Sequence, residues 1–227
     1  MNKYYFFLFF LINIIISSQN LFVNYEEKLK PNSSFLNNTL IPEDIKENYL
    51  ESIKTPAKYH LFVSGNECNY AFGESDNKGN IKKKYTPFVD SETFFYRKIN
   101  DTLVYQKATD DQGACYVRNK QIKGKTEYLK DEKIDQYNCK VVKITDETGD
   151  CIIWYTEDIP INAGPTYYWG FPGLVLKAED STMTIYATSV LLTNQKKEIK
   201  PLDTSVRIVE GADFRKYVKQ KAKNNGL

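Results

Sequence analysis

Short segments of alternating hydrophobic and polar residues run through most of the chain, a pattern typical of half-buried β-strands. In the segment 59–64, for example, Tyr, Leu and Val alternate with His, Phe and Ser. Clusters of Gly, Asn, Asp and Ser, which favour tight turns, separate the segments. The pattern predicts strands over residues 21–29, 57–65, 67–74, 93–100, 102–108, 113–119, 137–144, 151–156, 174–179, 183–192 and 206–209.

Helical periodicity is confined to two short segments. Residues 41–50 have Pro42 near the start and acidic residues in the first turn, as at many helix N-termini. Residues 212–223 place Phe214 and Tyr217 on one side and lysines on the others. We therefore predict a mainly β fold, either a curved antiparallel sheet or an open barrel, with one or two short helices.

The first eighteen residues differ in character from the rest. Lys3 precedes an apolar run over residues 4–16, and two serines follow that run. This order is typical of a secretory signal peptide, and the run is shorter than the roughly 20 residues that a membrane-spanning helix needs. We expect residues 1–18 to be a signal peptide and residues 19–227 to form a single β domain without a transmembrane segment, located in the periplasm or secreted.

The charge balance argues against a nucleic-acid partner. The chain has 31 Lys and Arg against 29 Asp and Glu, a formal net charge of +2. Nucleic-acid binding usually requires a strongly basic surface. The 17 tyrosines and 13 phenylalanines suit a sugar- or peptide-binding surface, and they suit a β core equally well.

Four cysteines remain after the predicted signal peptide: Cys68, Cys115, Cys139 and Cys151. An even number in an oxidising compartment favours disulfides, although four cysteines allow three pairings. Cys139 and Cys151 flank a predicted hairpin, so we expect them to pair, which leaves Cys68 and Cys115 as the second pair. Four buried free thiols are the alternative, because a one-residue shift in register places two thiols on opposite faces. No CxxC spacing is present, and a zinc site is not expected.

The segment 151–177 places a dense Gly, Pro and Trp loop between two predicted strands. Pro160 has no N–H to donate, so the chain must leave the sheet there. Gly164 and Pro165 favour a turn, and Pro172 followed by Gly173 favours a second turn with positive φ at the glycine. We expect a rigid corner covered by its own aromatic side chains, rather than a ligand site.

The core of this loop, residues 170–175, has the sequence Gly-Phe-Pro-Gly-Leu-Val and resembles the Gly-Leu-Pro-Gly-Leu-Ile signature of the GLPGLI proteins of Bacteroidetes envelopes. Weaker likeness extends to 22–29, 59–67 and 137–142, and the chain departs from the usual pattern at Glu157, Phe171 and Val175. The resemblance implies an envelope protein of unknown function. The motif residues, structural or ligand-binding, are Trp154, Tyr155, Pro160, Gly164, Pro165, Trp169, Gly170, Phe171, Pro172, Gly173 and Leu174.

No catalytic set emerges from the sequence. His60 is the only histidine, and we expect it at the surface or at a sheet edge. Glu157 and Asp158 are adjacent on an extended segment, so their side chains should point to opposite faces. The acidic cluster at 146–150 lacks the spacing of a calcium loop. We predict no catalytic residue, no metal and no cofactor.

These observations lead to three hypotheses. The first is a non-catalytic envelope binding or assembly module, not an enzyme, whose partner is an envelope protein or an apolar ligand and not a nucleic acid. The second is a periplasmic carrier that shelters an apolar, lipid-like ligand on a curved sheet. The third is a hydrolase that uses Asp158 together with Glu157 or a tyrosine.

Overall fold

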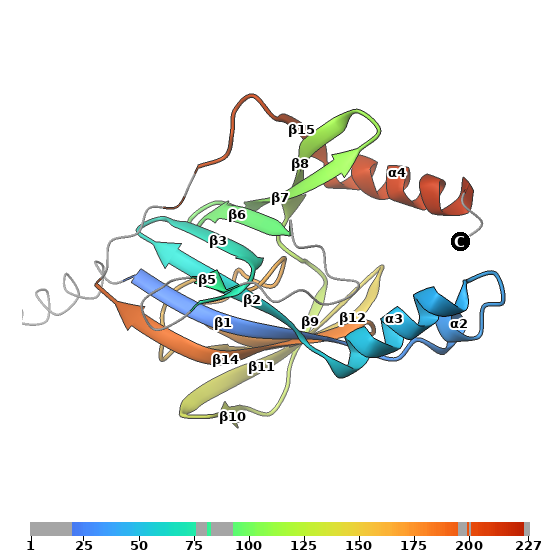
Figure 1. Cartoon of the computed structure of the whole chain (residues 1–227). Coiled ribbons are helices and arrows are strands. Elements are labelled where there is room, and N and C mark those ends of the chain that lie inside the picture. Colours follow the sequence, from blue (N-terminus) through green and yellow to red (C-terminus); the bar gives the residue numbers. More distant parts are fainter. Residues whose placement is uncertain (1–19, 76–80, 83–92, 195–198, 200, 225–227) are drawn as a thin grey trace, which may run out of the picture.

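The computed structural model describes residues 20–75, 81–82, 93–194, 199 and 201–224 and shows a mostly β protein (Figure 1). Its main feature is one large, open, mixed sheet of 13 strands. The order across the sheet is β10-β11-β12-β13-β14-β1-β2-β3-β6-β7-β8-β15. The remaining strand of this sheet, β9, also pairs with β11. The predicted fold class is therefore confirmed. The predicted signal peptide lies outside the described residues.

The sheet is built mainly from sequential antiparallel neighbours, as the alternation predicts. Its strands are β1 (Asn20–Leu29), β2 (Ala57–Ser64), β3 (Glu67–Phe72), β6 (Phe94–Lys98), β7 (Leu103–Asp110), β8 (Gly113–Lys120), β9 (Lys125–Tyr128), β10 (Glu132–Ile134), β11 (Tyr137–Asp146), β12 (Gly149–Thr156), β13 (Leu174–Glu179), β14 (Met183–Thr193) and β15 (Arg207–Glu210). A separate pair joins β4 (Glu74–Ser75) to β5 (Ile81–Lys82).

Two long-range pairings complete the sheet. The first strand β1 lies between β14 and β2, and β15 runs parallel to β8 at the sheet edge. All eleven predicted strands are present, with small differences at their ends. The missed strands β4, β5, β9 and β10 are short, and β9 is fully exposed, so no alternation marks them.

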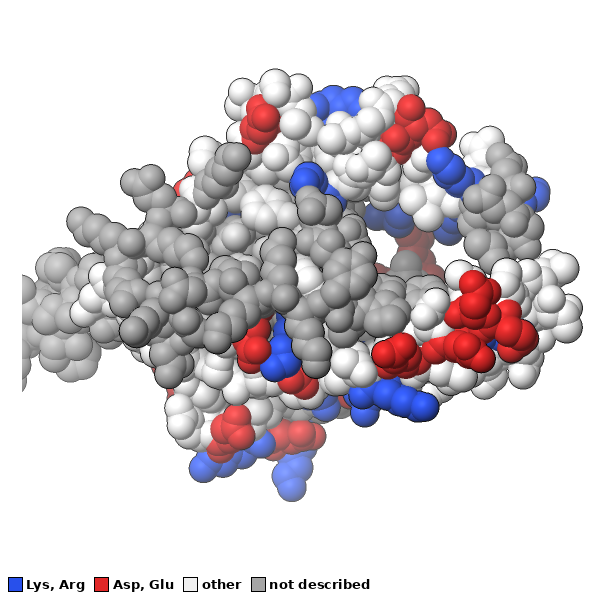
Figure 2. Space-filling model, in the orientation of Figure 1, with Lys and Arg blue, Asp and Glu red and all other residues white. Residues whose placement is uncertain are grey.

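Three helices are present among the described residues: α2 (Ser33–Leu36), α3 (Glu43–Lys54) and α4 (Gly211–Asn224). Both predicted helices are confirmed, as α3 and α4. The one-turn α2 was not predicted, and it is capped by Asn32, whose side chain accepts a hydrogen bond from the Phe35 amide. α3 and α4 project from the same end of the sheet in Figure 1, and acidic side chains gather over α3 in Figure 2.

In β1, β2 and β3 the large hydrophobic core lies on one face of the sheet, here called the inner face. It contains fully buried residues from strands far apart in the chain, among them Val23, Leu61, Ile153 and Leu176. A smaller cluster on the opposite, outer face contains Phe22, Phe62, Tyr96 and Ile199. Both faces of the central strands are therefore covered at least in part.

Because side chains cover both faces of the central strands, the prediction of an exposed His60 was wrong. His60 was expected at the surface, but it is 6% exposed and lies in β2 between β1 and β3. Its Nδ1 lies 3.0 Å from the carbonyl oxygen of Gly73. A polar side chain can be buried when such a partner is available.

The expected disulfides are also corrected, because all four cysteines are buried free thiols. Cys151 lies opposite Ile144 in the β11–β12 ladder, five positions beyond Cys139 along β11. At about 3.3 Å per residue the two cysteines are roughly 16 Å apart, well beyond the reach of a disulfide. Cys68 in β3 and Cys115 in β8 are separated by β6 and β7, so they are at least roughly 14 Å apart.

No helix among the described residues has the length and apolar character needed to cross a membrane.

Candidate functional site

The loop 157–173 between β12 and β13, here called the motif loop, packs into the inner face of the sheet. Ile159, Ala163, Tyr168 and Trp169 are all buried within the main core. The backbone of the loop is tied to β13, because the Leu174 amide donates to Ile159 and the Val175 amide donates to Ala163, at 3.0 and 2.9 Å. The loop therefore covers and fills the inner face.

Crowding explains two of the motif glycines. A Cβ atom on Gly164 would lie 2.0 Å from the carbonyl oxygen of Tyr168, and one on Gly173 would lie 2.0 Å from that of Thr156. Gly173 was expected to have a positive φ, but the positive φ belongs to Gly170, at 98°. The turn prediction was thus wrong in detail, since Gly173 is needed for close approach.

The remaining motif residues stabilise the flanks of the loop. Trp154 donates from Nε1 to Glu132 at 2.9 Å, and the Lys177 Nζ lies 4.0 Å from the centroid of a Trp154 ring. Tyr155 stacks on Phe171, with ring centroids 4.9 Å apart. Pro165 and Leu174 are buried, whereas Pro160 and Pro172 are exposed. The motif is a packed corner, as its glycines and aromatic residues indicate.

Arg97 of β6 joins the motif loop to the far half of the sheet. Arg97 is 2% exposed, and its guanidinium lies 4.1 Å from the centroid of the Trp169 ring and donates to the carbonyl oxygen of Asn162 in the loop. It also donates to the carbonyl oxygens of Lys98 and Ile99, at 3.2 and 2.8 Å. Burial lowers the pKa of the guanidinium from its ordinary value. One side chain thus fixes the loop and the end of β6 together.

The outer face of the same strands carries an open pocket of about 400 Å³, here called the tyrosine pocket. Its residues are Tyr96, Lys98, Asp101, Tyr105 and Tyr116, with others from 201–208. Tyr96 lies opposite Tyr105 in the β6–β7 ladder, and Tyr116 is the diagonal neighbour of Tyr105 on β8. The segment leading into β15 arches over these strands and forms the opposite wall (Figure 1).

Hydrogen bonds to protein groups hold the hydroxyls of Tyr96 and Tyr116. Tyr96 donates to the Glu67 carboxylate, and burial together with this bond raises the pKa of the Tyr96 phenol. Tyr105 lies opposite Arg118 in the β7–β8 ladder. The Tyr116 hydroxyl accepts from the Asp203 amide at 3.4 Å. These contacts orient the rings, which offer the pocket flat carbon surfaces. Tyr116 accepts in its bond to Asp203 and so keeps an O–H that can donate to a ligand.

Successive residues of β6 connect the two faces. Side chains alternate along a strand, so Tyr96 and Lys98 point to the tyrosine pocket while Arg97 points to the motif loop. Arg97 also fixes the start of the turn that carries Asp101 into the pocket. The motif loop therefore supports the pocket from behind.

The acidic residues considered in the sequence do not assemble a site. Glu157 and Asp158 are exposed, and Asp158 accepts a hydrogen bond from the Asn138 amide at 3.1 Å. Asp146 caps its own turn by accepting from Thr148. Within the described residues, no group of three or more His, Cys, Asp or Glu side chains is arranged to hold a metal ion.

Sequence reasoning missed one titratable group, Glu27 of β1. This carboxyl accepts hydrogen bonds from Tyr70, at 2.8 Å, and from Tyr59. Burial raises the pKa of Glu27 to about 7, and the two hydrogen bonds oppose that rise. In the sequence Glu27 is only a polar position in a predicted strand, so no local pattern marks it.

Comparisons with known proteins give family and fold likeness without an activity. Residues 97–177, from Arg97 to Lys177, match the sequence model of a family described as "Protein of unknown function (Porph_ging)". An uncharacterized protein of Methanocaldococcus jannaschii is 28% identical over 191 residues, which cover 69% of this chain and 42% of that protein. This chain thus spans less than half the length of that relative.

Solved structures of PNGF-II share the fold, with a TM-score of 0.53 and 17% identity. The match covers 89% of this chain and 33% of PNGF-II. GLPGLI membership and a Bacteroidetes source stay predictions. The matched segment includes Arg97, Trp169 and the whole motif loop, so in its central part this chain is similar to a family of proteins whose function is unknown.

Proposed function

We propose that this protein is an exported, non-catalytic binding module that recognises its ligand in the tyrosine pocket. The observation that carries the proposal is the placement of Tyr96, Tyr105 and Tyr116 on three neighbouring strands, all lining one open pocket. A volume of about 400 Å³ falls within the range of small-molecule sites. Export rests on the signal-like residues 1–18.

The alternative function, a carrier of an apolar ligand, has weaker support. A carrier needs an empty apolar cavity, and the inner face is the natural place for one. Much of that face is packed by Ile159, Tyr168 and Trp169 of the motif loop. The open pocket of about 320 Å³ beside Leu176 also carries Asp135, Gln136 and Ser189, so its lining is not purely apolar. The tyrosine pocket differs from a lipid cavity, because it is open and has Lys98, Asp101 and Asp203 among its lining residues.

The non-catalytic part of the proposal rests on where the expected acid and base groups lie. Asp158 is exposed and bound to a backbone amide, and the buried His60 lies near the carbonyl of Gly73. Neither residue lines the tyrosine pocket. A binding role does not require Asp158 or His60 to act as an acid or a base.

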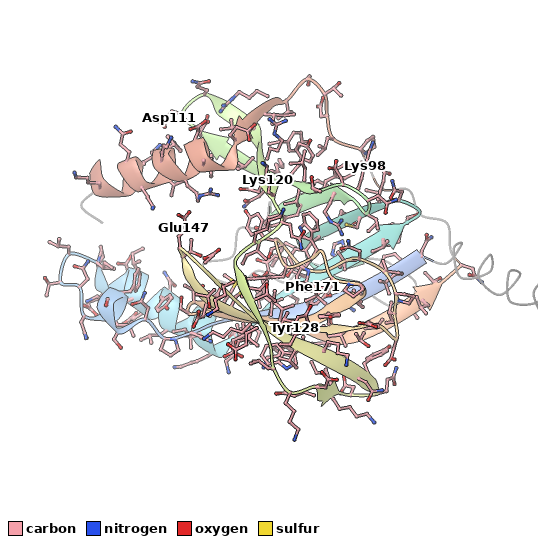
Figure 3. All side chains as sticks on the ribbon, turned by 180° about the vertical axis from the view of Figure 1, so that it is seen from behind. Lys98, Asp111, Lys120, Tyr128, Glu147 and Phe171 are labelled. Carbon is pink, nitrogen blue, oxygen red and sulfur yellow. The ribbon has the colours of Figure 1, made fainter. Side chains whose placement is uncertain are left out.

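The proposal is tested by native mass spectrometry of the protein isolated gently from the envelope of its own cells. Wild type is compared with the double variant Tyr105→Ala/Tyr116→Ala, and Tyr128→Ala is the matched control. Tyr128 is 72% exposed on β9, and Figure 3 shows it far from Lys98 of the pocket. Circular dichroism verifies that all three proteins are folded.

We expect a discrete non-covalent adduct on wild type and on Tyr128→Ala, and its loss from the double variant. An adduct retained equally by all three proteins contradicts recognition at the pocket. Turnover of an envelope glycan or peptide by the purified protein, abolished by Asp158→Asn, contradicts the non-catalytic assignment.

A further inference from the structure

We infer that the ligand of the tyrosine pocket is a saccharide. This inference rests on the proposed function, and it adds the chemical class of the ligand. Three features of the pocket carry it: the state of its tyrosine rings, the pairing of the strands beneath them, and the charges on its lining.

The tyrosine rings favour a ligand with a flat C–H surface. Tyr96 donates to Glu67, the Tyr116 hydroxyl accepts from the Asp203 amide, and Tyr105 lies opposite Arg118 in the β7–β8 ladder. The rings therefore contribute carbon surface with a fixed orientation, and the Tyr116 O–H can donate to a ligand oxygen beside it. The C–H face of a pyranose ring is the complement of such a surface, because it buries apolar area and leaves the hydroxyls at its edge.

Strand pairing argues against an extended peptide. Peptides commonly bind β proteins by adding a strand to a free sheet edge. The three strands that carry the tyrosines offer no such edge, because β6 lies between β3 and β7, β7 between β6 and β8, and β8 between β7 and β15. The free edge beside the pocket is that of β15, which contributes Ile208 to the lining. Recognition over the three tyrosine strands must therefore come from side chains.

The charged residues suit the hydroxyls of a sugar better than a phosphate. Among the described residues that line the pocket, Asp101 and Asp203 stand against one cation, Lys98. A surplus of carboxylates repels an anionic ligand. Carboxylates accept hydrogen bonds from hydroxyls, and an ammonium group donates to hydroxyl and ring oxygens. An uncharged or weakly charged saccharide satisfies both kinds of group.

The inference is tested on an array of oligosaccharides with neutral, N-acetylated and acidic residues, with an array of short peptides measured in parallel. Labelled wild type is compared with Tyr105→Ala, Tyr116→Ala, Tyr105→Phe and the control Tyr128→Ala. The best saccharide is then titrated by calorimetry. Labelling of tyrosine for NMR shows whether the signals of Tyr105 and Tyr116 move.

We expect wild type, Tyr105→Phe and Tyr128→Ala to bind the same saccharide, since each retains the pocket rings. Loss of a stacking ring weakens binding by about tenfold, so Tyr105→Ala and Tyr116→Ala should each show a rise in Kd of that size. Tyrosine signals of the pocket should shift, and that of Tyr128 should not.

Three results would overturn the inference, and they differ in what they leave of the proposed function. Binding of peptides but of no saccharide, sensitive to Tyr105→Ala, overturns the saccharide and leaves the binding module intact. Absence of binding on both arrays, together with an envelope adduct unaffected by the double variant, overturns both. Saccharide binding that is equal in wild type and Tyr116→Ala places the site elsewhere and also overturns the inference.

Discussion

Arg97 lies over the ring of Trp169, with its guanidinium carbon 4.1 Å from the ring centroid, although the two residues belong to β6 and to the motif loop. The guanidinium also donates to the carbonyl oxygens of Lys98, Ile99 and Asn162. A buried cation is costly unless its donors are satisfied, and carbonyl oxygens together with an aromatic face do so here. This contact links the loop to the strand that carries the tyrosine pocket.

The first prediction concerns this contact. Replacing Arg97 by Ala removes the donors of three carbonyl oxygens and leaves a cavity beside Trp169. We expect the free energy of unfolding to fall by about 2 to 4 kcal/mol. Urea unfolding measures it, and Arg215→Ala on the exposed face of α4 should change it by less than about 0.5 kcal/mol. If both variants lower the free energy of unfolding by the same small amount, Arg97 does not stabilise the loop.

A second prediction concerns the close approach at Gly173. A Cβ atom there would lie 2.0 Å from the Thr156 carbonyl oxygen, so Gly173→Ala forces the backbone of the loop or of β12 to move. We expect Gly173→Ala to lower the free energy of unfolding by about 1 to 3 kcal/mol, as overpacking does. The neighbouring Pro172 is exposed, and Pro172→Ala serves as the control in the same unfolding measurement. The idea fails if alanine is tolerated at both positions.

The third prediction is a pH dependence from Glu27. Its pKa in the folded protein, about 7, lies above its ordinary value of 4.5, so the folded state binds the proton more tightly than the unfolded state. The contribution of Glu27 to stability is therefore greatest below pH 4.5 and falls as the pH rises toward 7 and beyond.

Glu27→Gln keeps an acceptor for Tyr70 and removes the titration. Between pH 5 and pH 8 we expect the free energy of unfolding to fall less in the variant than in wild type. The difference between the two falls should be at most about 3 kcal/mol. The difference should be smaller than this limit, because Glu27 keeps some contact with solvent. Urea unfolding at the two pH values measures it. Parallel stability profiles for the two proteins would contradict the raised pKa.

The fourth prediction concerns the cysteines. All four are buried free thiols, and burial raises the pKa of the Cys68, Cys139 and Cys151 thiols to about 11. We expect slow reaction with a thiol reagent in the folded protein and rapid labelling of four thiols after denaturation without reductant. Intact mass under non-reducing conditions provides the check. A mass lower by two hydrogens for each bridge would show that disulfides form.

The strand pattern was predictable from sequence because alternation is local. Each strand with one face in a core repeats an apolar residue at every second position, and Gly, Asn and Asp mark its ends, as between β2 and β3. α3 was predictable for a similar reason, since Pro42 and the acidic first turn are local signals. The packed character of the motif loop also follows from its own glycines and aromatic residues.

The partners of these elements were decided only by the tertiary structure. The parallel pairing of β15 with β8, the burial of His60 and the separation of Cys139 from Cys151 depend on register and strand order, which no single segment encodes. The tyrosine pocket has the same origin. Tyr96, Tyr105 and Tyr116 are ordinary strand residues in the sequence, and they become one surface because hydrogen bonds between β6, β7 and β8 place them side by side.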